Sequence, residues 1–219
     1  MAPRDAVQAP DLPRLEIAQL PLAVEVEDLE LYGALIEREA GEPLRTRRVR
    51  IRESELRGVV LDARDPPGLE LLDVVLGGCG LSNVDGREGL IRRVEVARSR
   101  LVGFGLSKGK AQDLRVVDSS MELASFASAG LQNVVFERVN LTDASFMEAR
   151  LEGVEFIDCQ LTGTDFRGAR LTRCAIRGSS LEDVLGVDSL RGVRMPWPDV
   201  VASVGALAAA LDIAVETET

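Results

Sequence analysis

Large apolar residues recur at every fifth position along most of this 219-residue chain. Of the 31 positions numbered 31, 36, 41 and so on to 181, 26 hold Leu, Ile, Val, Met or Phe, without exception from Val116 to Leu181. The residue two positions earlier is small in the same region: Ala124, Ala129, Val134, Val139, Ala144, Ala149, Val154, Cys159, Thr164, Ala169, Cys174 and Ser179. The pattern therefore indicates a five-residue unit with two inward-facing side chains.

A period of five fits neither regular secondary structure. On a helix each repeat would rotate the large residue by about 140°, and on a strand an odd period would point successive large residues to opposite sides. A unit of three extended residues followed by a bend does fit, because the first and third side chains of the extended stretch point to the same side. If each bend is near 90°, four units close a square coil of twenty residues, and coils stack at roughly 4.8 Å. The pattern predicts a parallel β-solenoid.

The run FASAGLQNVVFERVNLTDASFMEARLEGVEFIDCQLTGTDFRGARL, with its alternating Phe and Leu centres, strongly resembles the pentapeptide-repeat proteins. The resemblance is specific from Leu71 to Leu181 and can be followed weakly back to Val26 and Leu31. It implies an all-β, right-handed quadrilateral β-helix. Some members of that family protect bacterial type II topoisomerases from quinolones by imitating duplex DNA, whereas many others have no known role.

The chain divides into a Pro-rich acidic arm over residues 1–25, a solenoid over 26–186 and a C-terminal segment over 187–219. The repeat is interrupted near 41–46, at the Asp65-Pro66-Pro67-Gly68 cluster, at Gly86 and around 109–111. Two prolines cannot donate to a strand ladder. We expect these breaks to be corner loops or local bulges, either as partner-contact loops or as tolerated surface irregularities.

The C-terminal segment predicts a helix over about 198–211. Pro198 suits a first helical position, and Val200, Val204, Leu207 and Leu211 share one stripe at helical spacing. An open solenoid end exposes its core, so this helix is expected to cap it. In the topoisomerase-binding members that the chain resembles, such an element also joins two subunits. Capping alone and a homodimer both remain open.

The amino-acid composition of the chain excludes most of the common types of catalytic site. The chain has no His, which excludes the commonest general base and the His-containing catalytic triads. Cys79, Cys159 and Cys174 occupy the small inward position, which favours core packing over metal or disulfide chemistry. We expect no enzyme activity, cofactor or metal. With 36 acidic and 26 basic residues, the net charge of −10 also disfavours direct binding of nucleic acid or an anionic membrane.

The ends of the chain suggest the compartment. The first 14 residues contain acids and prolines without an apolar stretch, so we expect no signal peptide. The longest apolar run, Val200 to Leu211, is too short to cross a bilayer. Three scattered cysteines suit a reducing compartment. We expect a cytoplasmic protein.

Sorting the outward charges by coil gives two unlike faces. One face, here called the acidic face, carries Asp62, Glu122, Asp143, Glu182 and Asp183. The opposite face, here called the basic face, carries Arg50, Arg52, Arg92, Arg93, Lys110, Arg150, Arg170 and Arg173. Residues 46–181 hold 20 basic and 19 acidic side chains, so the solenoid as a whole is nearly neutral.

These charges leave two hypotheses for a non-enzymatic, protein-binding chain. The first is DNA mimicry, in which the acidic face binds DNA gyrase or a related topoisomerase in quinolone or toxin protection, as the resemblance implies. The second is a structural scaffold or interaction module for another protein. A surface of mixed charge has no unique complement, so the sequence leaves the partner open.

Overall fold

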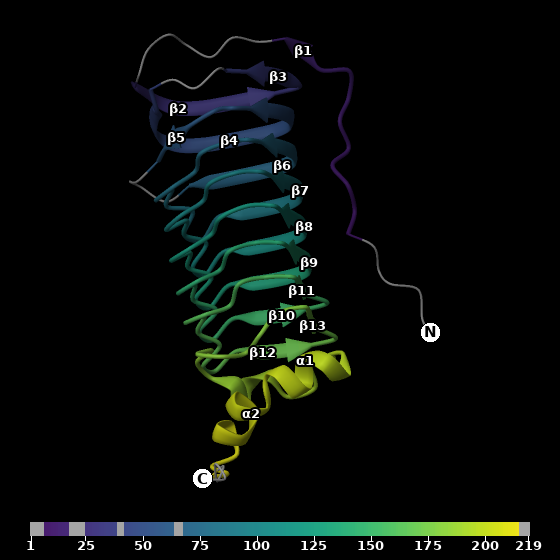
Figure 1. The fold of residues 1–219 in the computed structure, drawn as a ribbon. Helices are drawn as coiled ribbons and strands as arrows, with labels where there is room; N and C mark the ends of the chain where they lie inside the picture. The colour runs from purple at the N-terminus through teal and green to yellow at the C-terminus, as the bar shows by residue number, and fades with distance from the viewer. Residues whose placement is uncertain (1–6, 18–24, 39–41, 64–67, 215–219) are drawn as a thin grey trace.

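The protein is a rod of stacked coils with a helical segment at one end (Figure 1). The computed structural model describes residues 7–17, 25–38, 42–63 and 68–214. Parallel strands from successive coils form one 13-stranded sheet that wraps around a continuous apolar core. The expected parallel β-solenoid is confirmed, as is a short helical element at its C-terminal end.

The coil repeats every twenty residues. Leu71 pairs with Ile91, Ile91 with Ala111, and Ala111 with Leu131, each in parallel register. The strands are β1 (Glu16–Ile17), β2 (Glu25–Tyr32), β3 (Ala34–Glu37), β4 (Leu44–Arg57), β5 (Leu61–Asp62), β6 (Leu69–Gly77), β7 (Leu90–Ala97), β8 (Lys110–Val117), β9 (Gly130–Glu137), β10 (Arg150–Glu152), β11 (Glu155–Ile157), β12 (Arg170–Thr172) and β13 (Ala175–Arg177). The twenty-residue register holds every outward side chain directly above its counterpart in the next coil.

Each corner of a coil is made by a residue with left-handed backbone. Arg93, Arg98, Gly103 and Lys108 of one coil have φ values of 51°, 48°, 68° and 59°. The same conformation recurs at intervals of five residues along the solenoid. Gly, Asn and Asp reach this region at the lowest cost, and they occupy many of these corners. The three residues between corners are extended, so their first and third side chains point into the core.

Phenylalanine rings form two columns in the centre of the core. Phe126, Phe146 and Phe166 stack with centroid distances of 4.9 and 5.1 Å, and Phe136 stacks on Phe156 at 5.3 Å. Rings of the two columns meet edge to face. All five side chains are completely buried, which confirms that the large residue of each five-residue unit faces inward.

The interrupted repeats are more regular than the sequence suggested. Gly86 and Ala111 are buried within ordinary coils, so the expected loops or bulges at 86 and 109–111 are wrong. A side chain at position 86 would come within 2.7 Å of the carbonyl oxygen of Gly105, which explains why Gly stands there. Thr46 lies within β4 and is buried. Residues 39–41 and 64–67, which include Gly41 of one remaining break and Asp65, Pro66 and Pro67 of the other, lie outside the described residues.

Near the N-terminal end, one pairing of the coils departs from the twenty-residue register. Leu44 pairs with Leu61 and Arg45 with Asp62, an offset of 17 residues instead of twenty. Thr46 compensates locally, because its hydroxyl donates a hydrogen bond to the carbonyl oxygen of Glu27 or Arg48. Beyond this coil, β1 pairs with β3, so part of the N-terminal arm belongs to the sheet.

The C-terminal segment contains two helices where one was expected. After the single 3₁₀ turn η1 (Val187–Leu190), α1 (Trp197–Ala202) and α2 (Val204–Ala210) meet at Ser203. The continuous helix over 198–211 is therefore wrong. The Oγ atom of Ser203 accepts the N–H of Leu181 at 3.2 Å, and the carboxylate of Asp199 accepts the N–H of Gly178 at 2.7 Å. These bonds attach the helices to the last coil.

Candidate functional site

The acidic face is distributed over two adjacent columns of the solenoid. Asp62, Glu122 and Glu182 share one outward position in different coils, and Asp143 and Asp183 stand at the neighbouring corner. Asp143 and Asp183 have φ values of 55° and 58°. The sequence-based register therefore places all five carboxylates on one side. The intervening coils present mostly uncharged residues: Ser82, Asn83, Val102, Gly103, Thr162 and Gly163.

Two of the five carboxylates are engaged by neighbouring side chains. The carboxylate of Asp62 lies 3.9 Å from the guanidinium of Arg45 in the adjacent coil. The carboxylate of Glu122 accepts a hydrogen bond of 2.6 Å from the amide of Asn140, and both residues are half-buried. Asp143, Glu182 and Asp183 are exposed. The negative charge that a partner can reach is therefore concentrated at the C-terminal half of the face.

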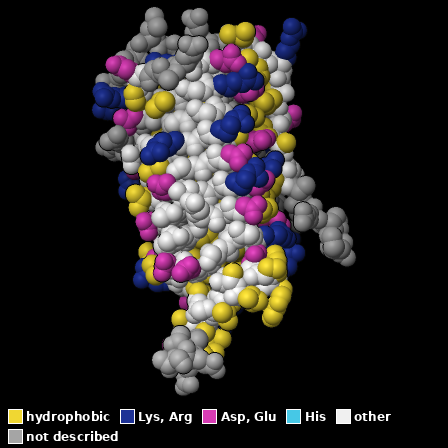
Figure 2. Space-filling view, viewed as in Figure 1, with side chains coloured by type: hydrophobic (Ala, Val, Ile, Leu, Met, Phe, Trp, Pro, Cys, Tyr) yellow, Lys and Arg dark blue, Asp and Glu magenta, His cyan; other side chains and the backbone are white. Residues whose placement is uncertain are grey.

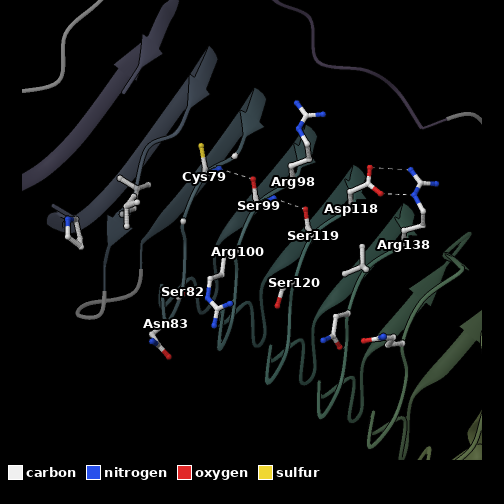
Figure 3. Close-up of a pocket in the computed structure, with 18 of the residues that line it drawn as sticks. Cys79, Ser82, Asn83, Arg98, Ser99, Arg100, Asp118, Ser119, Ser120 and Arg138 are labelled. Atoms are coloured by element: carbon white, nitrogen blue, oxygen red, sulfur yellow. Dashed lines mark hydrogen bonds and ion pairs between the residues drawn. The ribbon is translucent and has the colours of Figure 1, made fainter. Parts of the chain in front are cut away.

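A groove of about 1000 Å³ runs along the rod beside this face, across several coils (Figure 3). Its floor is formed by backbone and small polar side chains, among them Ser82, Ser99, Ser119 and Ser120. The hydroxyl of Ser99 accepts the N–H of Cys79, and the hydroxyl of Ser119 accepts the N–H of Ser99, each at 3.0 Å. Because these residues are small, the surface is recessed between the bulkier side chains on either side of them.

The walls of the groove carry charges of both signs. Its cations are Arg98, Arg100 and Arg138, and its anions are Asp62, Asp118 and Asp158. Arg138 donates two hydrogen bonds to Asp118, at 2.6 and 3.3 Å, and this pairing holds the pKa of the Asp118 carboxyl below its ordinary value. Among the described residues, Arg98 and Arg100 have no ion-pair partner. The groove is thus electrostatically balanced.

The surface as a whole has the same mixed character. In the view of Figure 2, cationic and anionic side chains alternate along the edges of the rod, and uncharged atoms cover most of the wall between them. On the basic face, Arg50 pairs with Glu30, Arg52 with Glu70, Arg93 with Asp73 and Arg173 with Glu152. Ion pairing between coils therefore compensates half of the cations on the basic face.

The proposed cap and dimer residues separate into two groups. Val200 and Leu207 are half-buried, and Leu207 packs against the core of the solenoid. Val204 and Leu211 are 64% and 69% exposed, because the break at Ser203 turns α2 out of line with α1. Trp197 lies near them in sequence and is 76% exposed. The single stripe expected over the four residues is therefore divided between the solenoid end and solvent.

The described residues offer little catalytic chemistry. Cys79, Cys159 and Cys174 are buried, and burial raises the pKa of each thiol above its ordinary value, which disfavours the nucleophilic thiolate. No group of His, Cys, Asp and Glu within the described ranges could hold a metal ion. None of the helices there has the length and apolar character that crossing a bilayer requires. The surface instead offers fixed arrays of polar side chains.

Sequence reasoning missed the groove, although it sorted the residues that line it correctly by coil. The groove lies at the junction of two walls, and its depth comes from the Ser ladder next to long Arg side chains. The signal was available in the small residues at positions 79, 99 and 119, one coil apart. Of these, only Cys79 was singled out, as a core residue.

Comparison with known proteins identifies the repeat. Residues 117–185 match the family model of the pentapeptide repeat region. No curated protein matches the chain. Residues 117–185 are therefore similar to pentapeptide repeats, and the twenty-residue register of the coils continues outside that range.

Several solved structures show a weak similarity to the chain. Full-length QnrB1, a plasmid-mediated fluoroquinolone resistance protein, is 14% identical over 84% of this chain and 99% of its own, with a TM-score of 0.33. HetL, a pentapeptide repeat protein involved in heterocyst differentiation regulation in the cyanobacterium Nostoc sp. strain PCC 7120, is 16% identical over 86% of this chain and 92% of its own, with a TM-score of 0.25. These values are too low to transfer a function.

Proposed function

We propose that this chain is a non-enzymatic, protein-binding pentapeptide-repeat protein whose acidic face binds the positively charged DNA-binding surface of DNA gyrase. The observation that carries this proposal is the set of exposed carboxylates at the C-terminal half of the face: Asp143, Glu182 and Asp183. A rigid solenoid presents such charges at fixed spacing, so a basic partner gains attraction without having to order them. The family resemblance supplies the identity of the partner.

Charge density sets the expected strength of this interaction. The five carboxylates span six coil intervals, which corresponds to about 29 Å at the strand spacing. That is roughly one charge per 6 Å, against one per 1.7 Å along duplex DNA. The acidic face is therefore a sparse imitation of DNA, and we expect binding at micromolar concentrations that weakens as salt screens the charges.

We further propose that the protein forms a homodimer through α1 and α2. Trp197, Val201, Val204 and Leu211 are large apolar side chains that this single chain leaves more than half exposed. A twofold interface between these helices would bring the Glu182 and Asp183 ends of two acidic faces together. The charge available to one partner would then double, which offsets the low density of a single face.

A supercoiling assay with DNA gyrase of the source organism tests the proposal. In the test variant Asp143→Asn, Glu182→Gln and Asp183→Asn remove three charges while keeping the side-chain shape, and Asn tolerates the left-handed corners. We expect wild-type protein to inhibit supercoiling at micromolar concentration and this variant to lose at least about tenfold in potency. The matched control changes Arg92, Arg150 and Arg170 on the opposite face to Gln and should inhibit as the wild type does.

Absence of inhibition by the wild-type protein in low salt would refute gyrase binding. The alternative is then a scaffold or interaction module for another protein, and the groove favours it. Its balanced cations and anions suit a partner surface of mixed charge better than a uniformly basic one. Equal potency of the two triple variants would likewise remove the acidic face from the mechanism.

A further inference from the structure

The N-terminal arm lies along the outside of the solenoid. In Figure 1 the purple segment that precedes β1 descends beside the coils of β6 to β9. It meets the solenoid at one corner, where Asp73 of β6, Arg93 of β7 and Asp113 of β8 stand one above the other. We call these three residues the corner column. Asp73 and Asp113 are only 6% and 2% exposed, although their backbone lies at the surface of the rod.

The two carboxylates of the corner column bind the backbone of the arm. The N–H of Asp11 donates to Oδ1 of Asp73 at 3.0 Å, and the N–H of Gln8 donates to Oδ1 of Asp113 at 3.4 Å. Val7, Pro10, Leu12 and Leu15 of the arm are half-buried. Hydrogen bonds from backbone N–H groups to carboxylates are charge-assisted and therefore strong.

The spacing of these contacts matches an extended peptide. Asp73 and Asp113 are two coils apart, which is about 9.6 Å at the strand spacing. Gln8 and Asp11 are three residues apart, which an extended chain spans in about 10 Å. Of the two residues between them, Pro10 lacks an N–H, which leaves Ala9 as the single other backbone donor in this stretch. The distance between the two carboxylate acceptors therefore matches the distance between two N–H donors three residues apart in an extended segment.

The charged side chains of the corner column favour a particular residue type at the position of Asp11. Arg93 donates to the carboxylate of Asp73, and this bond lowers the pKa of the Asp73 carboxyl. The negative charge of Asp11 also acts on Arg93 and raises its pKa, as do those of Asp73 and Asp113. An acidic side chain at the position of Asp11 is therefore favoured, because the hydrogen bond from its N–H to Asp73 places it near Arg93, the partner of Asp73.

We propose that the corner column is a binding site for an extended, proline-containing acidic segment of a partner protein, and that residues 7–15 occupy it within the chain. The proposal rests on the protein-binding function above but uses a different surface from the acidic face. The arm acts as an intramolecular competitor, so a partner binds when its segment displaces the arm.

Peptide binding to a full-length chain with a released arm tests the proposal. Gln8→Pro and Asp11→Pro remove both N–H donors and should undock the arm. A fluorescent peptide with the sequence of residues 7–15, VQAPDLPRL, should then bind this variant in an anisotropy titration. It should bind wild-type protein at least about tenfold more weakly, because the tethered arm is present at an effective concentration near millimolar.

A second set of variants locates the bound peptide. Asp73→Gly and Asp113→Gly, added to the released-arm variant, remove the two acceptors but keep the left-handed corner, since Gly153 occupies the same column with a φ of 65°. Peptide binding should be lost. Asp158→Gly is the matched control, because its column already contains Gly58, Gly78 and Gly178 at left-handed φ. This control should bind the peptide with unchanged affinity.

Hydrogen exchange gives a second readout that does not depend on releasing the arm. In wild-type protein the N–H groups of Gln8 and Asp11 should be protected, and the Asp73→Gly, Asp113→Gly variant should lose that protection. Failure of the peptide to bind the released-arm chain, or binding that survives loss of both acceptors, would overturn the proposal. Gyrase inhibition by the same variants reports separately on the acidic face, so either proposal can fail alone.

Discussion

Each phenylalanine in the core column supports its neighbours in two adjacent coils. Phe146 stacks on Phe126 and Phe166 and meets Phe136 and Phe156 edge to face. Replacing Phe146 with Ala should lower the free energy of unfolding by about 3 to 5 kcal/mol, since it removes burial and leaves a cavity. Urea denaturation followed by circular dichroism measures the change. Met147→Ala, at an exposed position, should change stability by less than about 0.5 kcal/mol.

The three cysteines give an independent probe of the same core. Burial raises the pKa of Cys79, Cys159 and Cys174, so little thiolate forms near neutral pH. We expect the native chain to react with Ellman's reagent at least about tenfold more slowly than the chain unfolded in guanidinium. Rapid labelling of any one thiol in the native protein would show that its coil opens or that its register is misassigned.

At the residue scale, the inward-facing positions could be predicted from the sequence, whereas the contacts of several outward-facing residues could not. A five-residue period constrains every core side chain, because each coil repeats the same two inward directions. Nothing in the sequence distinguishes Asp73 and Asp113 from other outward acids, since their contacts are made with an arm more than sixty residues earlier. Such a contact leaves no periodic signal in the chain.

At the scale of elements, the helices close the end of the solenoid through hydrogen bonds as well as apolar contact. Ser203 is 2% exposed, and its hydroxyl accepts the N–H of Leu181. Ser203→Ala would leave that buried N–H without this acceptor and should cost about 1 to 3 kcal/mol. Faster hydrogen exchange at Leu181, together with a lower urea midpoint, would report the loss. Met147→Ala, at an exposed position of the solenoid, is the control and should leave both unchanged.

The same bond explains why the helix boundary was mispredicted. Helical spacing of Val200, Val204, Leu207 and Leu211 indicates one amphipathic helix when only local sequence is considered. Ser203 instead takes φ −104° and ψ 9°, which separates α1 from α2 and lets its hydroxyl reach the last coil. The competing interaction is tertiary, so propensity alone could not reveal it. The breaks at Gly86 and Ala111 were misjudged for the related reason that neighbouring coils keep a weak unit in register.

For the whole molecule, order along the rod comes from stacking identical coils, and function must come from the surface that the stack presents. Ion pairs between coils, such as Arg138 with Asp118, leave much of that surface electrically balanced. The sequence could therefore predict which charges share a face, but the groove and the docked arm arise only when side chains from several coils meet. The arm docks on outward positions that the repeat leaves free to vary, whereas the groove also depends on the small inward residues at positions 79, 99 and 119.

The association state is the last prediction and also belongs to the whole molecule. Trp197, Val201, Val204 and Leu211 are exposed apolar side chains concentrated at one end of the rod, where a twofold contact would bury them. Light scattering of the full chain at micromolar concentration should give about twice the monomer mass of 23.7 kDa. Val201→Glu with Val204→Glu should yield monomers, because each charge would be buried without a partner.

Leu123→Glu provides the matched control for this experiment. Leu123 is also an exposed apolar residue, but it lies at a solenoid corner with a φ of 58°, and its counterpart one coil further on is the acidic residue Asp143. The control should remain dimeric. A wild-type chain that scatters as a monodisperse monomer would reduce α1 and α2 to a cap, and the acidic faces of two chains would then have no means of acting as one surface.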